Sequence, residues 1–473
     1  MITPLFKLSQ DEDFIYLEAK LKYVKFSDFD YFIENKNFRF SLKPYYLNIY
    51  LPENLKNESE LNSFKYDIDK QILFCKLEKL NKIYFENLNI ISTLLENPAL
   101  NNGNKNDKKI GTLKIEEINN NNNDDLIEKN KINIKNKEEL NNYLFELFNQ
   151  PEIENLSISE ENKLEDYFYG FNNSFIDVFD KRKEELLEIC DLNPKKVPIK
   201  LRFYAKLENE ERDFDIEHYI SDLFLLDKYS DFYDENFENL LNLNNEKFIQ
   251  KISDNNNNNF QYNENELMII QQVNKINLPT LLNNLNKNNN NFCPFKFYLN
   301  IIDILFAYIY DLLMTEYEHS SESAWHINKL SNTLSNFIDF NKNFYTHSSI
   351  IDSNILELLI KNVLINNYRR VLIYPLFRNI KICDKIKKNL YEILETGKFG
   401  IIKCFLDIRN ILEKNEPRYL LNRIYIDPLL KWIEVFSEEK IFVIIKDTIN
   451  DLNIDKEDLK LNLENYESEY LNN

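Results

Sequence analysis

The N-terminal part of the chain alternates hydrophobic and polar residues with a period of two, most clearly in residues 38–43, 45–51 and 73–78. Successive side chains of a β-strand point to opposite faces of a sheet, so this alternation predicts strands with one buried face. Polar turns separate the runs at short intervals, which is typical of a small antiparallel sandwich. We therefore predict an all-β domain over residues 1–97.

Hydrophobic residues become rare between residues 98 and 142, where Asn, Lys, Asp and Glu dominate. Such a segment cannot bury enough apolar surface to offset the entropy lost on folding, and we predict a disordered linker. Two similar polar tracts, near residues 254–260 and 283–291, predict expanded loops inside the following domain.

After the linker, the hydrophobic spacing changes to three and four residues, which predicts helices. The stretch 301–313 is apolar on nearly all faces and predicts a helix at the centre of a bundle. Pro375 marks a helix boundary, and Gly397 and Gly400 fall where helices would end. The predicted fold is thus multidomain, with a β-sandwich followed by a large all-α domain over residues 143–473.

The charge is strongly acidic, because 58 Lys and Arg face 78 Asp and Glu and leave a formal charge of −20. Direct binding of nucleic acid requires cations against phosphates, so we expect none. The longest apolar stretch carries Lys296, Asp303 and Asp311, which are costly inside a bilayer, so we expect no membrane span. The N-terminus has no secretory pattern, and five scattered Cys fit free thiols in a reducing compartment.

Sites of chemistry are weakly supported. Glu316-x-x-His319 and Asp215-x-x-His218 have the spacing of a carboxylate-bridged di-metal site, but so acidic a chain produces such pairs by chance. The segment Gly397-Lys398-Phe399-Gly400 lacks the spacing of a phosphate-binding loop. We predict no catalytic residues, no metal and no cofactor.

Several short motifs follow one another in order along both parts of the chain. In the predicted sandwich they are Met1-Ile2-Thr3-Pro4, Lys43-Pro44-Tyr45-Tyr46-Leu47 and Tyr66-Asp67-Ile68-Asp69-Lys70. In the helical part they include Tyr169-Gly170-Phe171, Asp215-Ile216-Glu217-His218-Tyr219, Thr315-Glu316-Tyr317-Glu318-His319, Tyr374-Pro375-Leu376-Phe377-Arg378-Asn379 and Pro417-Arg418-Tyr419. Together these motifs resemble those of the SHQ family, the assembly chaperones of H/ACA small nucleolar ribonucleoproteins. The resemblance implies an N-terminal CS domain and a family-specific helical domain.

The resemblance also implies a non-enzymatic function. Proteins of this family bind the pseudouridine synthase dyskerin over its RNA-binding surface, and RuvB-like AAA+ ATPases are associated with their release. We accordingly expect a monomeric RNA placeholder that is present in the nucleus, including the nucleoplasm, and in the cytoplasm. The alternatives are a co-chaperone that acts on the ninety-kilodalton heat-shock protein through its CS domain, and a helical metalloenzyme.

A placeholder for RNA must offer carboxylates and apolar anchors to a basic surface. The carboxylates predicted to bind the partner are Asp447, Asp451, Asp455, Glu457 and Asp458. A turn broken by proline and bearing Arg and aromatic residues is poorly explained by packing, which adds Tyr374, Pro375, Phe377, Arg378 and Asn379 as predicted partner contacts. Phe6, Gln10 and Lys79 are candidate contacts for a second client.

Overall fold

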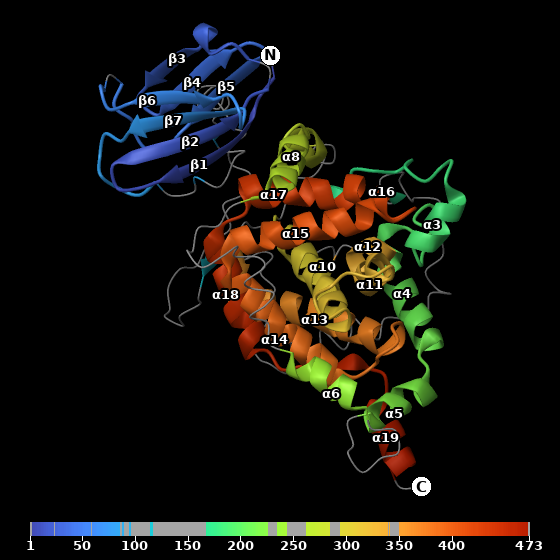
Figure 1. The fold of residues 1–473 in the computed structure, drawn as a ribbon. Helices are drawn as coiled ribbons and strands as arrows, with labels where there is room; N and C mark the ends of the chain where they lie inside the picture. The colour runs from blue at the N-terminus through green and yellow to red at the C-terminus, as the bar shows by residue number, and fades with distance from the viewer. Residues whose placement is uncertain are drawn as a thin grey trace, which may run out of the picture. The chain divides into compact units, whose positions relative to one another are not determined.

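The computed structural model of the chain describes residues 2–85 except 23 and 58, residues 88, 94–95 and 114–116, and then 167–225, 234–243, 262–283, 294–338, 340 and 350–471. The chain forms two compact units. The first consists of Met1–Lys109, Ser253–Ile276 and Glu434–Phe436, and the second consists of the remaining residues. Figure 1 gives the course of the chain.

The first unit is an antiparallel β-sandwich, as the period-two pattern predicts. Its strands are β1 (Leu5–Gln10), β2 (Phe14–Lys20), β3 (Asp30–Glu34), β4 (Asn37–Leu42), β5 (Tyr45–Tyr50), β6 (Ser63–Asp67) and β7 (Ile72–Glu78), with a short 3-10 helix η1 (Phe26–Asp28) before β3. One sheet has the order β1-β2-β7-β6 and the other has the order β3-β4-β5. Alternate residues of both sheets, such as Phe38, Phe40 and Leu77, are buried between them.

The first unit also contains helix α8 (Glu264–Val273), which the prediction assigned to the helical domain. The helix packs against β1, and the Gln271 amide donates to the carbonyl oxygen of Pro4 at 3.2 Å. On the neighbouring strand, the Lys20 ammonium lies 2.7 Å from the Glu264 carboxylate. This grouping differs from the prediction because helical periodicity does not reveal which distant strand a helix packs against.

The second unit is mostly helical, which confirms the predicted order of an all-β part followed by a helical part. Its longer helices are α4 (Ile199–Asp213), α5 (Ile216–Phe224), α10 (Phe295–Met314), α13 (Ser353–Ile373), α14 (Ile380–Glu395), α15 (Gly397–Glu413), α17 (Asp427–Phe436), α18 (Glu439–Asp451) and α19 (Leu463–Leu471). The shorter helical elements are η4 (Phe171–Asn173), α3 (Lys183–Ile189), α6 (Glu235–Asn242), α9 (Leu278–Asn283), α11 (Ser323–Leu330), α12 (Asn332–Asn336), α16 (Tyr419–Leu421), η6 (Asn422–Ile426) and η7 (Lys456–Leu459).

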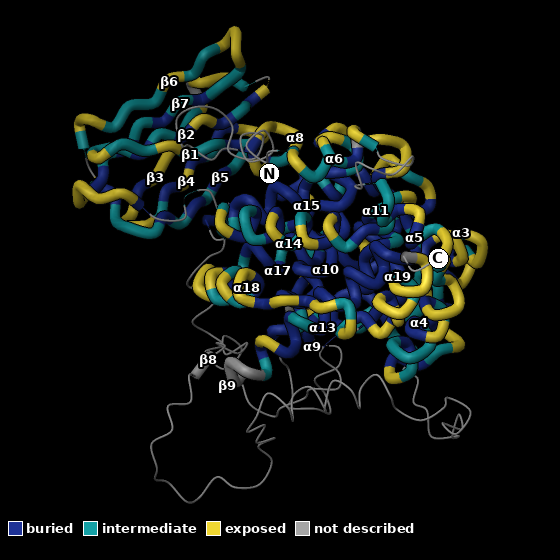
Figure 2. Tube along the Cα trace, turned by 90° about the horizontal axis from the view of Figure 1, so that it is seen from below, coloured by how far each residue is buried: buried dark blue, intermediate teal, exposed yellow. Residues whose placement is uncertain are grey.

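Helix α10 is the centre of this unit, and Figure 2 shows it buried along its length. It packs against α11, α13 and α14, which confirms the central helix expected from the apolar stretch 301–313. By length and composition it is the one described helix that could cross a membrane, and its most apolar stretch is 94% buried inside the protein.

The structure bears on other expectations only in part. Within the predicted linker, β8 (Lys114–Glu116) pairs in parallel with β9 (Ile350–Asp352), which differs from a linker without secondary structure. The rest of the linker and nearly all of the two predicted polar loops lie outside the described residues.

Gly397 has a φ of +72° at the end of α14, as expected of a helix end, whereas the same expectation for Gly400 is wrong because it lies inside α15.

Candidate partner-binding surface

The turn at residues 374–379 connects α13 to α14 and is fixed to α5. The Asp222 carboxylate accepts a hydrogen bond from the backbone N–H of Arg378 at 2.6 Å. The Asn379 amide donates to the carbonyl oxygen of Asp222 at 3.0 Å, and its own oxygen accepts from the N–H of Lys381, which caps α14. The turn therefore has an internal structural role.

The other predicted residues of this turn also have internal partners. Pro375 is buried, and its carbonyl oxygen accepts from the Arg378 guanidinium at 2.9 Å. Phe377 packs on Phe237, with ring centroids 5.2 Å apart. Packing and internal hydrogen bonds thus explain more of this motif than the sequence indicated, and partner binding by these residues stays a prediction. The side chain of Leu376, which the sequence reasoning missed, is 69% exposed at the tip of the turn.

Tyr374 connects the turn to a buried group of charges. The cations of Lys329 and Arg370 lie over its ring at 4.1 and 4.5 Å from the centroid. Its hydroxyl donates to the Asp213 carboxylate at 3.4 Å, and burial raises the pKa of Tyr374. The ring thus covers the cations from one side.

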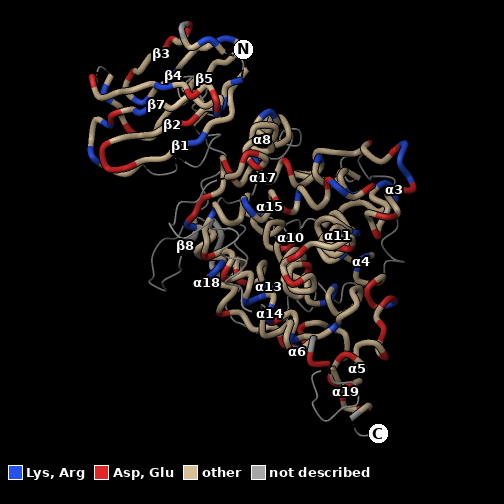
Figure 3. The backbone as a smooth tube through the Cα atoms, in the orientation of Figure 1, with Lys and Arg blue, Asp and Glu red and all other residues tan. Residues whose placement is uncertain are grey.

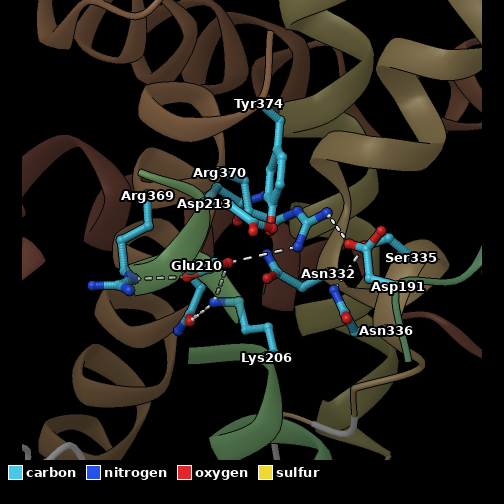
Figure 4. A network of polar contacts seen from close by, with 12 residues as sticks. Asp191, Lys206, Glu210, Asp213, Asn332, Ser335, Asn336, Arg369, Arg370 and Tyr374 are labelled. Atoms are coloured by element: carbon cyan, nitrogen blue, oxygen red, sulfur yellow. Dashed lines mark hydrogen bonds and ion pairs between the residues drawn. The ribbon is translucent and has the colours of Figure 1, made fainter. Parts of the chain in front are cut away.

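We name the charges next to Tyr374 the charge cluster, which consists of Asp191, Lys206, Glu210, Lys329, Arg369 and Arg370; all but Lys329 are labelled in Figure 4. Lys206, Glu210, Arg369 and Arg370 are buried, whereas Asp191 and Lys329 are half-buried. Glu210 lies 2.9 Å from the Lys206 ammonium and 2.8 Å from the Arg369 guanidinium. Arg370 reaches Asp191 at 2.8 Å, and Lys329 reaches the same carboxylate at 2.5 Å. These contacts connect α4, α11 and α13 with Asp191, which lies two residues after the end of α3.

The charge cluster holds more cations than carboxylates. Burial lowers the pKa of Lys206 to about 7. Burial opposes the ionisation of Glu210 as well, but the attraction of the surrounding cations outweighs it and holds the pKa of Glu210 below its usual range. Arg369 and Arg370 remain charged at any physiological pH, so Glu210 must stay ionised to balance them. A sequence signal did exist, since two adjacent Arg residues lie in the last two turns of a helix, directly before the apolar residues Val371, Leu372 and Ile373.

A second buried carboxylate, Asp303 of α10, organises the chain around α12. Its oxygens accept from the Ser331 hydroxyl at 2.5 Å and from the backbone N–H of Thr333 at 2.8 Å. The side chains of Asn332 and Asn367 also donate to it, each at 3.0 Å. Asp303 therefore satisfies donors at the start of α12 and anchors α13 to the central helix.

The two His residues of the metal hypothesis have other partners. The ring of His319 lies 3.2 Å from Asp311 and 2.8 Å from Asp407, one carboxylate at each nitrogen. Burial opposes protonation of His319, but the hydrogen bonds and charges of the two carboxylates raise its pKa to about 9. Asp215 caps α5 through the N–H of His218. The described residues contain no group of three or more His, Cys, Asp or Glu placed to hold a metal ion.

The predicted carboxylates near the C-terminus lie on α18, η7 and the segment that connects them. Asp447, Asp451, Asp455 and Glu457 are exposed. Asp458 is half-buried, 2.9 Å from the Lys361 ammonium, and it forms a reciprocal cap of η7 with Asp455. The structure therefore leaves Asp447, Asp451 and Glu457 without a capping role.

A second exposed acidic stretch covers the end of α4 and the start of α5, where Asp and Glu are coloured red in Figure 3. Its exposed residues are Glu208, Glu211, Asp213, Asp215 and Glu217. Within it, the Asp213 carboxylate lies 3.1 Å from the Arg212 guanidinium. The acidic charge of the second unit is thus spread over at least two surfaces.

The three candidate contacts in the first unit are occupied inside it: Phe6 is buried, while Gln10 and Lys79 bind the chain that follows β7. Phe6 and Lys79 are 3% exposed. The Lys79 ammonium donates to Gln10 at 2.9 Å and to the carbonyl oxygen of Ile83 at 2.7 Å, while Gln10 exchanges two hydrogen bonds with the backbone of Phe85. These residues have a structural role, and contact with a second client remains a hypothesis.

Comparisons with known proteins agree with this architecture. Residues 3–95 match the family model described as SHQ1-like, CS domain, and residues 251–463 match the one described as SHQ1 protein, Shq1 domain. The Protein SHQ1 homolog of Xenopus tropicalis is 31% identical over 98% of this chain and 68% of that protein. The Mus musculus homolog is 28% identical over 99% of this chain and 75% of that protein, and Protein shq1 of Schizosaccharomyces pombe is 26% identical over 99% and 96%. The chain belongs to the SHQ1 family.

Proposed function

We propose that this protein binds the pseudouridine synthase dyskerin over its RNA-binding surface and holds that surface until the H/ACA particle assembles. Membership of the SHQ1 family supports a role as an assembly chaperone of H/ACA ribonucleoproteins. In this proposal the protein is a non-enzymatic monomer of the nucleus and cytoplasm, it does not bind nucleic acid itself, and RuvB-like ATPases promote its release.

The observation that carries the proposal is the set of exposed carboxylates on α18 and η7. Asp447 and Asp451 are four residues apart and therefore lie on one face of α18, with Glu457 shortly after it. A protein surface that binds RNA carries Lys and Arg against phosphates. Carboxylates arranged along one face can pair with the same cations, which excludes RNA by occupying its contacts.

The predicted pairs are solvent-exposed, so each contributes modestly to affinity and more to the rate and specificity of association. Repulsion between RNA and the chain's net charge of −20 also favours the exclusion of RNA from the bound synthase. The exposed Leu376 is the apolar anchor that we propose on the same unit.

Charge reversal with a matched control tests the proposal. The test variant carries Asp447→Lys, Asp451→Lys and Glu457→Lys, and it leaves Asp455 and Asp458 in place because they cap η7. The control reverses the same number of charges at Glu184, Glu185 and Glu188 of α3, on another part of the unit (Figure 1).

Titration calorimetry with purified dyskerin at several salt concentrations measures both effects. Three exposed ion pairs contribute about 0.2–1 kcal/mol each, so we expect the test variant to bind about tenfold more weakly, with a smaller dependence on salt. We expect the control to bind like the unmodified chain. Equal affinity and equal salt dependence for both variants would contradict the proposed role of these carboxylates.

A further inference from the structure

The β-sandwich has four strands at the edges of its sheets, and three of them are protected. Helix α8 packs against β1, and β5 is flanked by Ile2, whose backbone exchanges hydrogen bonds with Pro44 and Tyr46. Strand β6 carries the exposed Lys65 at its middle, a charge that discourages pairing with another strand.

Strand β3 has neither a covering helix nor an exposed Lys among the described residues, and its exposed charges, Asp30 and Glu34, are both acidic. No described strand pairs with its outer side, and the side chains of Tyr31 and Phe32 at its middle are 46% and 43% exposed. A two-residue turn joins it to β4, with Glu34 opposite Asn37. In a hairpin with a two-residue turn, the pair next to the turn is hydrogen-bonded, and every second pair after it is also hydrogen-bonded. The pairs of Tyr31 and Ile33 are therefore the non-bonded ones, so the backbone N–H and C=O groups of these two residues point away from β4.

The side chains of β3 define what could pair with it. Tyr31 and Ile33 lie opposite the buried Phe40 and Phe38, so they face the core side of the sheet. Asp30, Phe32 and Glu34 therefore face the outer side, and both carboxylates are exposed. The Arg39 guanidinium of the neighbouring strand lies over the Phe32 ring, 4.2 Å from its centroid, so the outer face already brings a cation onto this aromatic residue.

We propose that the outer edge of β3 binds an extended segment of a partner protein by β-strand addition. The segment has a basic residue opposite Asp30, an apolar residue opposite Phe32 and a basic residue opposite Glu34. Backbone hydrogen bonds to Tyr31 and Ile33 fix its register, and cross-strand pairs of opposite charge select its sequence. This surface lies in the first unit and is independent of the carboxylates on α18 and η7.

The test uses the full chain and two fluorescent five-residue peptides, acetyl-Lys-Thr-Val-Thr-Lys-amide and its counterpart with Glu in place of both Lys. Anisotropy measures binding, and hydrogen exchange read by mass spectrometry locates it. We expect the basic peptide to bind at least tenfold more tightly than the acidic one and to slow exchange in residues 30–34. The double variant Asp30→Lys, Glu34→Lys should reverse the preference, with its folding verified by circular dichroism.

A third peptide separates strand addition from charge attraction. It keeps both Lys residues but carries N-methyl groups on the amides that would face β3, so it cannot donate the backbone hydrogen bonds. We expect its binding to fall at least tenfold. The proposal is overturned if the basic peptide fails to bind, if the methylated peptide binds equally well, if charge reversal leaves the preference unchanged, or if protection appears outside β3.

Discussion

The Arg369 guanidinium lies 2.8 Å from the Glu210 carboxylate, and both side chains are almost completely buried. This pair joins α13 to α4, and Lys206 and Arg370 approach the same carboxylate. Glu210 thus faces three cations from two helices, of which Arg370 has a second and closer carboxylate in Asp191. Removing one partner from such a buried group leaves charges that neither water nor protein compensates, which makes Glu210 a sensitive point of the second unit.

We expect Glu210→Gln to destabilise the second unit by about 3–5 kcal/mol, because the variant keeps the buried cations and loses their counter-charge. The matched control is Glu208→Gln, an exposed position on the same helix, with an expected change of about 0.5 kcal/mol or less. Thermal unfolding followed by far-ultraviolet circular dichroism measures both. A melting temperature of the Glu210 variant equal to that of the control would contradict this role.

The pH dependence of stability should reveal the His319 contacts. Its pKa is about 9 in the folded protein, against about 6.5 for an ordinary His, because Asp311 and Asp407 favour the protonated ring. A raised pKa means that the stabilisation is complete below about pH 6.5 and is lost as the pH rises through 9.

The pKa of Lys206 is lowered to about 7 in the folded protein, against about 10.4 in the unfolded chain. Between these two pH values the unfolded chain binds more protons at Lys206, so this residue makes stability increase with pH, the opposite of the His319 effect. The measurement is therefore the difference in the free energy of unfolding between the unmodified chain and His319→Gln, in which the Lys206 contribution cancels. We expect this difference to be largest near pH 6.5 and to shrink towards pH 9.5. A difference that is constant with pH would contradict the ionic role of His319.

Two residues of the turn at 374–379 should affect stability and partner binding separately. Asn379→Ala removes a buried cap and should destabilise the fold by about 1–2 kcal/mol. Leu376→Ala should leave the melting temperature unchanged, because its side chain is mostly exposed, but weaken dyskerin binding under the proposed function. Differential scanning calorimetry and titration calorimetry measure the two effects. If Leu376→Ala binds dyskerin normally, this turn is structural alone.

The sequence predicted the features that depend on local periodicity. Alternating residues identified the β-sandwich, and the apolar stretch 301–313 identified the central helix, because each pattern directly reports which side chains are buried. The same pattern could not assign α8 to the first unit. That assignment depends on contacts such as the one between Gln271 and Pro4, which are far apart in the sequence.

The candidate site was less predictable for a similar reason. The motif at residues 374–379 looked like a partner surface because a turn broken by proline carries Arg and aromatic residues. Its internal partner Asp222, which binds Arg378 and Asn379, is more than 150 residues away in the sequence. Exposed carboxylates are abundant in this chain, so the sequence alone could not distinguish Asp458, which pairs with Lys361, from Asp451. Those differences arise only when distant elements pack together.

Competition with guide RNA tests the central claim most directly. Labelled H/ACA guide RNA is titrated with dyskerin at increasing concentrations of this protein, and fluorescence anisotropy reports the bound RNA. We predict that the apparent Kd of RNA rises in proportion to the protein concentration, and that the variant with Asp447, Asp451 and Glu457 changed to Lys is a weaker competitor. An unchanged RNA affinity at saturating protein, or a ternary complex that contains RNA, would contradict it.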